Sequence, residues 1–292
     1  MPKCGMNNKT LYVTDLDGTL MRYDKTVSDY TIDTLNSLID QGMLITYATA
    51  RSFHSAWEIT KEIHFSVPVI TRNGTVLADQ IQKKETDILS FSDCDVKRLR
   101  QMLSGIIEPM GFVTAYFDGH MSKSYRQGEL NIGLRKYVDE HSGDKRMRLV
   151  SDDTDLFAGT VTYVTLIAAK EELQPVYEKV CHAGNWECVF QKDTYGEEYW
   201  LEICPYGATK AQAILKCKQS LGCDRIVVFG DSTNDLSMFA IADEACAVAN
   251  AIDEVKRKAT HIIAGNEDDG VAKFLMNQWF PPSFLMSWFS SV

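Results

Sequence analysis

Apolar runs and amphipathic segments alternate along the chain up to about residue 80. The run LYV at 11–13 ends in acidic residues and a glycine, which is typical of a buried parallel strand that enters a loop. Further apolar runs at 43–49 and 68–71 predict two more strands. Between the runs, apolar residues recur every three to four positions, which predicts helices. The candidate caps of these helices are Ser28 or Asp29, and Ser52.

The C-terminal third of the chain repeats this alternation. Strands are predicted at 225–231, 245–249 and 261–264, and helices at 234–242, 251–259 and 270–278. Strands that alternate with helices in this way favour an α/β fold with a doubly wound parallel sheet. We therefore expect both ends of the chain to build one sheet, whose ligands bind outside the carboxyl ends of its strands.

The middle of the chain has a different pattern. Strand-like runs at 112–117 and 161–169 alternate with helical stretches near 95–107 and 171–182, and 186–203 is typical of two paired strands. This pattern predicts an α+β module inserted into the first domain. The predicted domains are a core domain from 1–80 and 205–292, and an inserted cap domain from 81–204.

Composition narrows the range of partners. The 292 residues include 30 Lys and Arg against 40 Asp and Glu, a formal net charge of −10. This balance argues against nucleic-acid binding, because a phosphate backbone repels excess carboxylate. No run approaches the roughly 18 apolar residues of a membrane span, and the opening residues lack a secretory signal pattern. We therefore expect a cytoplasmic protein that binds neither nucleic acid nor membrane.

Cysteines and the aromatic tail add two smaller expectations. Eight cysteines are scattered without a C-x-x-C pair or zinc-ligand spacing, which favours reduced, buried thiols. The tail at 279–289 is rich in aromatic residues and carries no Lys or Arg. Packing against the core domain or a subunit interface is therefore expected there rather than contact with a membrane.

The candidate chemistry begins directly after the first predicted strand, in the hexapeptide DLDGTL. Asp15 and Asp17 lie two residues apart at the end of this strand, where a substrate would sit. Their mutual repulsion favours a divalent cation, and Mg²⁺ suits such oxygen ligands. The alternative is that each acid only caps a helix or stabilises a turn.

A second acidic loop, GDSTND, directly follows the strand predicted at 225–231. Asp231 and Asp235 supply further oxygen ligands, and Gly230 lets the backbone come close. By itself this loop could be an ordinary capped helix start. Two acidic loops at strand ends of one sheet favour a metal site instead.

These motifs resemble those of a known family. DLDGTL, the ATAR loop that contains Thr49, Lys210 and GDSTND follow the order and context of the four motifs of the haloacid dehalogenase superfamily. The insertion resembles the type IIB cap of Cof-type sugar-phosphate phosphatases. The resemblance covers nearly the whole chain, and it implies a Mg²⁺-dependent hydrolase of phosphate esters.

The resemblance also implies roles for the acidic residues. Asp15 matches the nucleophile that forms an aspartyl-phosphate, and Asp17 matches the general acid/base. The implied Mg²⁺ ligands are the Asp15 carboxylate, the Asp17 backbone carbonyl and Asp231, with Asp235 as a further ligand or a hydrogen-bond acceptor beside them.

Phosphate-binding roles follow in the same way. The resemblance implies phosphate contacts for Thr49, Ala50, Lys210 and Asn234. The family usually has glycine where this chain has Ala50. Arg51, which follows Ala50, and Asn73, in the TRNGT turn, are further candidates for substrate binding, although a tight turn also explains Asn73.

The expected function is a Mg²⁺-dependent phosphomonoesterase that acts on small phosphorylated metabolites, with phosphorylated sugars as the expected substrates. One alternative is a sugar phosphomutase or phosphotransferase that uses the same aspartate. Another is a signalling module that holds phosphate on Asp15 without turnover, although Asp17 argues against it because an acid/base at that position promotes hydrolysis.

Overall fold

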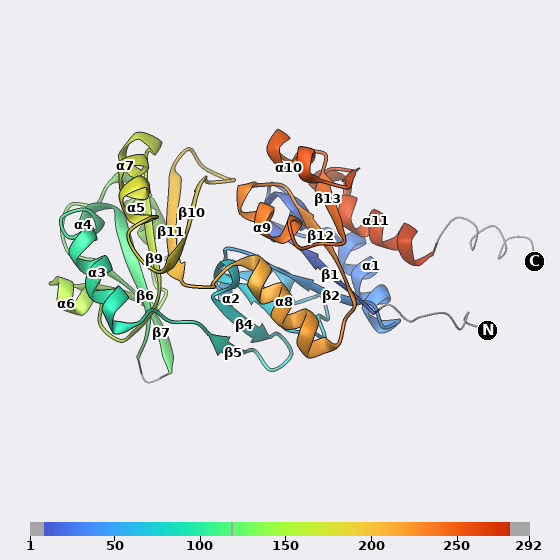
Figure 1. Cartoon of the computed structure of the whole chain (residues 1–292), viewed down its shortest axis with the longest axis horizontal. Coiled ribbons are helices and arrows are strands. Elements are labelled where there is room, and N and C mark those ends of the chain that lie inside the picture. Colours follow the sequence, from blue (N-terminus) through green and yellow to red (C-terminus); the bar gives the residue numbers. More distant parts are fainter. Residues whose placement is uncertain (1–8, 118, 281–292) are drawn as a thin grey trace, which may run out of the picture. The chain divides into compact units, whose positions relative to one another are not determined.

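The computed structural model describes residues 9–117 and 119–280. The chain divides into two units at Asp87/Ile88 and Ala208/Thr209, so that residues 9–87 and 209–280 build one unit and the intervening segment builds the other (Figure 1). We call these the core unit and the inserted unit. The aromatic tail, on which the sequence made a prediction, lies outside the described residues from position 281 onwards.

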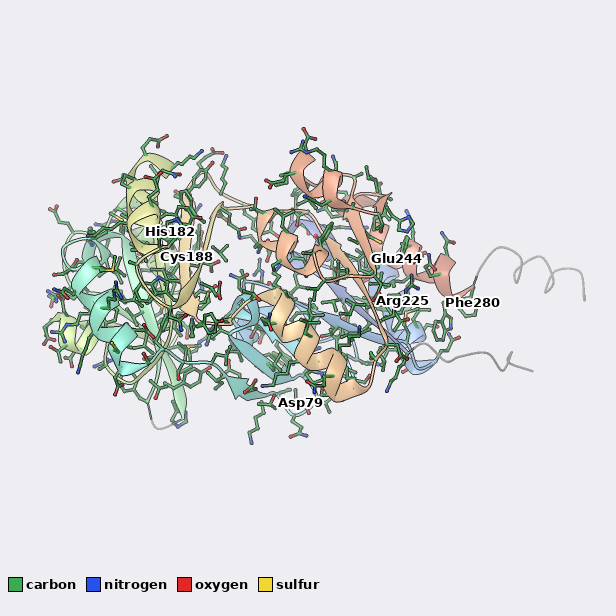
Figure 2. All side chains as sticks on the ribbon, viewed as in Figure 1. Asp79, His182, Cys188, Arg225, Glu244 and Phe280 are labelled. Atoms are coloured by element: carbon green, nitrogen blue, oxygen red, sulfur yellow. The ribbon has the colours of Figure 1, made fainter. Side chains whose placement is uncertain are left out.

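The core unit contains the predicted parallel sheet. Its strand order is β14-β13-β12-β1-β2, and all neighbouring pairs are parallel. The strands are β1 (Thr10–Thr14), β2 (Leu44–Tyr47), β12 (Arg225–Gly230), β13 (Glu244–Val248) and β14 (His261–Ile263). At the amino ends of β12 and β13, Arg225 and Glu244 form an ion pair (Figure 2). The acidic loops lie at the opposite edge of the sheet, where they follow the carboxyl ends of β1 and β12.

Helices connect these strands and bury their apolar faces on the sheet. They are α1 (Asp29–Asp40), α2 (Phe53–Thr60), α8 (Lys210–Leu221), α9 (Leu236–Phe239), α10 (Asp253–Lys258) and α11 (Gly270–Trp279). The predicted caps of the first two are confirmed, because Ser28 and Ser52 accept hydrogen bonds from the backbone N–H groups of Thr31 and Ser55. Helix α1 packs against α11, and α8 packs against α9. The prediction of a doubly wound α/β core is confirmed.

The connections of this sheet reverse direction between β1 and β12. From β1 the chain continues to β2 on one side, and from β12 it continues to β13 and β14 on the other. Ligands of open α/β sheets bind at such a reversal, outside the carboxyl ends of the strands. Both predicted acidic motifs follow these two central strands.

A small antiparallel sheet moves the domain boundary that the sequence predicted. Strands β3 (Val69–Thr71), β4 (Val76–Asp79) and β5 (Lys84–Ile88) form a sheet in the order β3-β4-β5. Strand β5 was not predicted, because the segment KETDI is exposed or half-buried and has no apolar run. Since β5 pairs with β4, the core unit extends to Asp87 rather than ending at residue 80.

The inserted unit is built on a six-stranded sheet with the order β10-β11-β9-β6-β7-β8, antiparallel except between β7 and β8. Its strands are β6 (Gly111–Phe117), β7 (His120–Arg126), β8 (Met147–Val150), β9 (Thr160–Ala168), β10 (Trp186–Lys192) and β11 (Tyr199–Pro205). Its helices are α3 (Asp93–Leu103), α4 (Ile107–Met110), α5 (Ile132–Glu140), α6 (Asp153–Leu156) and α7 (Lys170–Val180). The predicted α+β character and the predicted pair of strands at 186–203 are confirmed.

The inserted unit ends at Ala208 rather than at the predicted residue 204. Strand β11 extends past residue 204, since its pairing with β10 runs to Pro205. The inserted unit has an apolar core of its own, which includes Val164, Leu166 and Leu201. Near its two ends, Leu89 and Ala208 belong to one apolar cluster. Because the two ends of the insertion lie close together, the insertion can be accommodated without disrupting the sheet of the core unit.

The prediction of reduced, buried thiols holds in part. The described cysteines form no disulfide, and Cys204, Cys217, Cys223 and Cys246 are buried. Cys94 is exposed near the start of α3, so the prediction of burial is wrong there. Among the described residues, no helix has both the length and the apolar character needed to cross a membrane.

We predict that residues 88–208 fold when expressed without the core unit, because their sheet and apolar core are complete within the segment. Thermal unfolding followed by circular dichroism should show one cooperative transition. In that segment Leu166→Ala should lower the free energy of unfolding by about 2–5 kcal/mol, since Leu166 is fully buried. A segment without a cooperative transition would contradict the assignment of an independent unit.

Candidate active site

The two acidic loops meet at the carboxyl edge of the parallel sheet. Strands β1 and β12 pair with Thr14 opposite Phe229, and the backbone N–H of Asp15 donates to the Phe229 carbonyl at 2.9 Å. Asp15 and Asp231 therefore follow neighbouring strands at the same edge of the sheet. One carboxylate oxygen from each of Asp15, Asp231 and Asp235 lies within 4.8 Å of the others. The structure thus brings together acids that lie more than 200 residues apart in the sequence.

A tight turn places the first motif against the second. Asp17 (φ −72°, ψ 117°) and Gly18 (φ 76°, ψ −2°) have the conformation of a type II turn, which requires a positive φ at its third residue. A Cβ atom at Gly18 would lie 2.5 Å from Asp231 Oδ2, so glycine is also needed for space. The Thr19 hydroxyl donates to Asp231 Oδ1 at 2.9 Å. The DGT sequence thus fixes Asp231 beside the first loop.

Asp235 organises the second loop from within. Its Oδ2 atom accepts hydrogen bonds from the backbone N–H groups of Asp231 and Ser232 at 2.9 and 3.0 Å. A Cβ atom at Gly230 would lie 2.7 Å from Asp235 Cγ, so the glycine lets the carboxylate approach the backbone. Asn234 accepts a hydrogen bond from the Ser232 hydroxyl at 2.9 Å.

Lys210 joins the two loops electrostatically. Its Nζ atom donates to Asp15 Oδ1 at 2.6 Å and to Asp235 Oδ1 at 2.7 Å. Only 1% of the Lys210 surface is exposed. Burial would lower its pKa, but the two carboxylates outweigh burial and raise it. Lys210 is therefore a permanent cation in this site, as a buried ammonium with two acidic partners must be.

The start of helix α8 holds Lys210 in place. Thr209 caps the helix by accepting a hydrogen bond from the Gln212 N–H at 3.1 Å. Gly74 (φ 96°) lies so close that a Cβ atom there would be 2.2 Å from the Thr209 carbonyl oxygen. The turn that contains Gly74 therefore supports the helix that carries Lys210.

The loop after β2 carries the predicted phosphate-binding residues. The Thr49 hydroxyl accepts a hydrogen bond from the Arg51 N–H at 3.1 Å, and the Thr49 carbonyl accepts one from the Asn73 N–H at 2.9 Å. The Arg51 side chain donates to Asp17 through Nε at 2.8 Å and through Nη2 at 2.6 Å. This fork-like pairing fixes the direction of the Asp17 carboxylate. Thr49 and Asn73 are both buried.

The cluster carries excess negative charge. The site contains the four carboxylates of Asp15, Asp17, Asp231 and Asp235 and the two cations of Lys210 and Arg51, so the ionised groups carry a net charge of −2. Burial raises the pKa of Asp15 well above its usual range; Lys210 opposes this rise and the other three carboxylates add to it. Burial, followed by the charge of Asp235, raises the pKa of Asp231 to about 7.

These residues fit a divalent cation. Carboxylate oxygens at this spacing are the ligands that Mg²⁺ prefers, and a charge of +2 would balance the cluster. At Gly18 a Cβ atom would lie 2.5 Å from Asp231 Oδ2, so no side chain fits between this backbone and the Asp231 carboxylate.

The structure thus forms two sets of contacts. Asp15, Asp231, Asp235 and Lys210 make up one, and Asp17, Arg51 and Thr49 make up the other. The charge of Asp17 acts on Asp15 and Asp231 and so couples the two sets. Ala50 lies between Thr49 and Arg51, and Asn234 lies in the second acidic loop. Asn73 lies in a tight turn with a φ of 52°, which is the turn role that the sequence left open, and its N–H also donates to the Thr49 carbonyl. The sequence missed Thr19 as a partner of Asp231, although its position after Asp-Gly was a usable signal.

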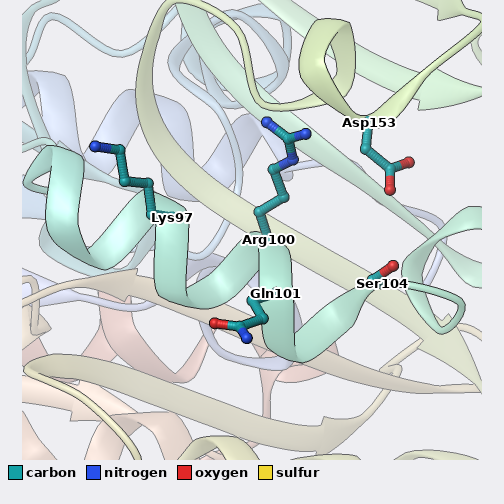
Figure 3. A pocket seen from close by; sticks show the side chains of 5 residues that line it. All are labelled: Lys97, Arg100, Gln101, Ser104 and Asp153. Carbon is teal, nitrogen blue, oxygen red and sulfur yellow. The ribbon is translucent and has the colours of Figure 1, made fainter.

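A hollow in the inserted unit has different chemistry. It measures about 390 Å³ and is lined by Lys97, Arg100 and Gln101 of α3, by Ser104, which follows that helix, and by Asp153 of α6 (Figure 3). The Asp153 carboxylate already accepts a hydrogen bond from Arg126 at 2.6 Å. The residues that line the hollow therefore offer no pair of carboxylates for a metal ion.

Comparisons with known proteins found a matching family, related sequences and similar folds. A family model described as haloacid dehalogenase-like hydrolase matches residues 12–275. The 5-amino-6-(5-phospho-D-ribitylamino)uracil phosphatase YitU of Bacillus subtilis strain 168 is 29% identical over 282 residues, with 91% of this chain and 96% of the relative covered. The pyridoxal phosphate phosphatase YbhA of Escherichia coli K12 is 24% identical, with 89% and 95% covered. The subclass IIB sugar phosphatase BT4131 has a similar fold, with a TM-score of 0.71, 20% identity and 93% and 98% of the chains covered.

We predict that Asp231→Asn flattens the pH dependence of stability in metal-free protein. The pKa of Asp231 rises from 3.8 to about 7 on folding, so the folded state binds this proton more tightly. The resulting stabilisation is complete below about pH 4 and is lost as the pH rises to about 7. Thermal unfolding in EDTA should therefore show a larger loss of stability from about pH 5 to pH 8 for the wild type than for Asp231→Asn.

The exposed Asp33 of α1 provides the control, and Asp33→Asn should follow the wild type. Added Mg²⁺ should raise the melting temperature of the wild type more at the higher pH, because protons and cation compete for the carboxylate. Parallel pH curves for the wild type and Asp231→Asn would contradict the prediction.

We predict that Gly74→Ala destabilises the protein more than Gly42→Ala. The two glycines have nearly equal φ values, 96° and 94°, so each alanine should carry backbone strain of about 1–2 kcal/mol. Only at Gly74 would the added Cβ meet the Thr209 carbonyl; at Gly42 nothing lies within 4 Å. Urea unfolding of both variants measures the difference, and equal losses would show that Gly74 does not support α8.

Proposed function

The chain belongs to the haloacid dehalogenase-like hydrolases, and on that basis we propose that it is a phosphatase of small phosphorylated metabolites with Asp15 as its nucleophile. The observation that carries this proposal is the buried Asp15 carboxylate, held by Lys210 at 2.6 Å beside Asp231 and Asp235. A carboxylate fixed next to a cation and a metal cradle has the positioning and charge compensation that phosphoryl transfer needs.

In the proposed first step, an Asp15 oxygen attacks the phosphorus atom of the substrate. The bond to Asp15 forms while the bond from phosphorus to the ester oxygen breaks, and Asp17 gives its proton to the departing alkoxide. In the second step, Asp17 takes a proton from a water molecule that attacks the same phosphorus. The bond to Asp15 then breaks, inorganic phosphate leaves, and both aspartates return to their starting state.

Arg51 occupies the Asp17 carboxyl group before substrate binds. Its guanidinium donates hydrogen bonds of 2.6–3.0 Å to both Asp17 oxygens. We propose that the phosphate group of the substrate draws Arg51 away, so that the Asp17 carboxyl group becomes free to face the ester oxygen. The position of Arg51 beside Thr49, in the loop expected to bind phosphate, supports this exchange.

The remaining site residues divide between cation and phosphate. We propose that Asp15, Asp231 and the Asp17 backbone carbonyl hold Mg²⁺, which supplies neutralisation of the phosphoryl oxygens when it is bound. Asp235 accepts hydrogen bonds at both of its oxygens, so we assign it to orienting Lys210 and the second loop. Thr49, the Ala50 N–H, Lys210 and Asn234 are the proposed phosphate contacts.

The substrate class is inferred from the relatives. YitU, YbhA and BT4131 are named as phosphatases of a phosphoribityl aminouracil, of pyridoxal phosphate and of sugar phosphates. The substrates named for YitU and YbhA are small molecules with one phosphate group. We therefore propose a small metabolite monophosphate as the substrate here, with sugar phosphates as the first class to test.

We predict that Asp15→Asn and Asp17→Asn fail at different steps with p-nitrophenyl phosphate and Mg²⁺. Asp15→Asn should release no nitrophenol, because it lacks the attacking carboxylate. Asp17→Asn should release about one equivalent in a burst, because nitrophenolate leaves without an acid, and should then stall without a base for water. Acid quenching followed by mass spectrometry should find phosphate on Asp15 in the stalled protein.

Asp87→Asn is the matched control, because it also removes a carboxylate that pairs with a lysine, Lys216, at an exposed position. It should turn over like the wild type. Full turnover by Asp15→Asn would exclude Asp15 as the nucleophile. Full turnover by Asp17→Asn would exclude Asp17 as the base.

A further inference from the structure

A third loop contacts both acidic loops of the candidate site. It follows β13 and contains Asn250 and Ile252. The Asn250 side-chain amide donates to the Gly18 carbonyl at 2.7 Å, and the Ile252 N–H donates to the Asp231 carbonyl at 2.9 Å. One short loop is thus attached to the backbones of both metal-site motifs.

The loop that follows β14 fixes the Asn250 side chain by a hydrogen bond. After β14, the Asn266 N–H donates to Asn250 Oδ1 at 3.1 Å, and the Asn266 side chain donates to the Met21 carbonyl at 2.9 Å. Asn266 is buried, with 2% of its surface exposed. Each end of the Asn250 amide therefore has a partner of the right kind, which fixes its orientation.

These contacts hold the Gly18–Thr19 peptide, which determines how close the first acidic loop lies to Asp231. The Gly18 carbonyl is bound by Asn250, while the hydroxyl of the next residue, Thr19, is bound to Asp231. Gly18 itself lies so close to Asp231 that a methyl group would not fit between them. A shift of the Gly18–Thr19 peptide would therefore move Asp231 relative to Asp15 and the Asp17 carbonyl.

We propose that Asn250, supported by Asn266, is a positioning residue that sets the affinity of the site for its divalent cation. The proposal rests on the function proposed above, since it takes Asp15, Asp231 and the Asp17 carbonyl as the ligands. Asn250 acts through the Gly18 backbone. Residues that orient metal ligands in this indirect way typically change metal affinity by about 10–100-fold when they are removed.

The chain offers a matched control in Asn36. Its side chain donates to the Glu62 carbonyl and accepts from the His64 N–H, both at 2.8 Å, and so ties α1 to a loop. Asn36 and Asn250 therefore make the same two kinds of bond, but the contacts of Asn36 involve no residue of the two acidic loops. Any general loss of stability from removing such a tie should appear in both variants.

Binding of Mg²⁺ to the full chain, measured by isothermal titration calorimetry, tests the proposal without turnover. We expect Asn250→Ala to weaken Mg²⁺ binding by about 10-fold or more, and Asn36→Ala to leave it within about twofold of the wild type. The melting temperature in EDTA measures the structural loss separately. A variant that melts lower but binds Mg²⁺ like the wild type would overturn the proposal.

Asn250→Asp gives a second test that does not depend on Asn250→Ala folding. Aspartate keeps the acceptor for the Asn266 N–H, loses the donor to Gly18, and adds a negative charge that by itself would attract Mg²⁺. We expect weaker binding in spite of this charge. Equal or tighter binding would overturn the proposal.

Asn266→Ala tests whether Asn266 supports Asn250 in this role. Alone, it should weaken Mg²⁺ binding less than Asn250→Ala does, and it should add less than about twofold in the Asn250→Ala background, since residues that act through one contact are not additive. If the two substitutions instead weaken Mg²⁺ binding independently, so that their effects multiply, the role of Asn266 would be overturned.

The same titrations separate failure of this proposal from failure of the proposed function. If the wild type binds no Mg²⁺ and Asp231→Asn does not change that result, the proposed function fails as well. If the wild type binds Mg²⁺ and the Asn250 variants bind it equally well, only the positioning role of Asn250 is excluded.

Discussion

The structure of the core unit depends on placing like charges side by side at one edge of its sheet. Asp15, Asp231 and Asp235 present oxygens within 4.8 Å of one another, and burial strengthens their repulsion because it removes water. Lys210 compensates part of this charge through bonds to two of them. A buried lysine is stable only with such partners. Each group therefore makes the burial of the others tolerable.

The close approach of these groups is achieved by backbone rather than by long side chains. Adjacent parallel strands bring Asp15 and Asp231 to the same edge of the sheet. Glycines at positions 18, 74 and 230 leave out the Cβ atoms that would clash with Asp231, Thr209 and Asp235. Short side chains on a rigid sheet edge lose little conformational freedom when they meet a ligand. Such preorganisation is what electrostatic stabilisation of phosphoryl transfer requires.

The sequence predicted the parts of this arrangement that depend on local pattern. The core strands carry apolar runs, and the acidic motifs follow them directly, so the fold class and the main carboxylates were accessible. Strand β5 was not, because its residues are exposed or half-buried and its existence depends on pairing with β4. The pairing of Arg51 with Asp17 and the contacts of Asn250 depend on loops that meet only in three dimensions, and single polar residues in short turns have no spacing that marks them.

The side chains that hold the loops of the site together by hydrogen bonds are neutral. Thr19, Asn250 and Asn266 bind carboxylate or carbonyl oxygens as hydroxyl or amide donors. A lysine or arginine in their place would make stronger bonds, but it would also cancel part of the excess charge of −2 on which attraction of a divalent cation depends. Neutral donors fix geometry and leave the charge unchanged. The site therefore separates two tasks: Lys210 and Arg51 set its charge, and the hydroxyl and amide groups set its shape.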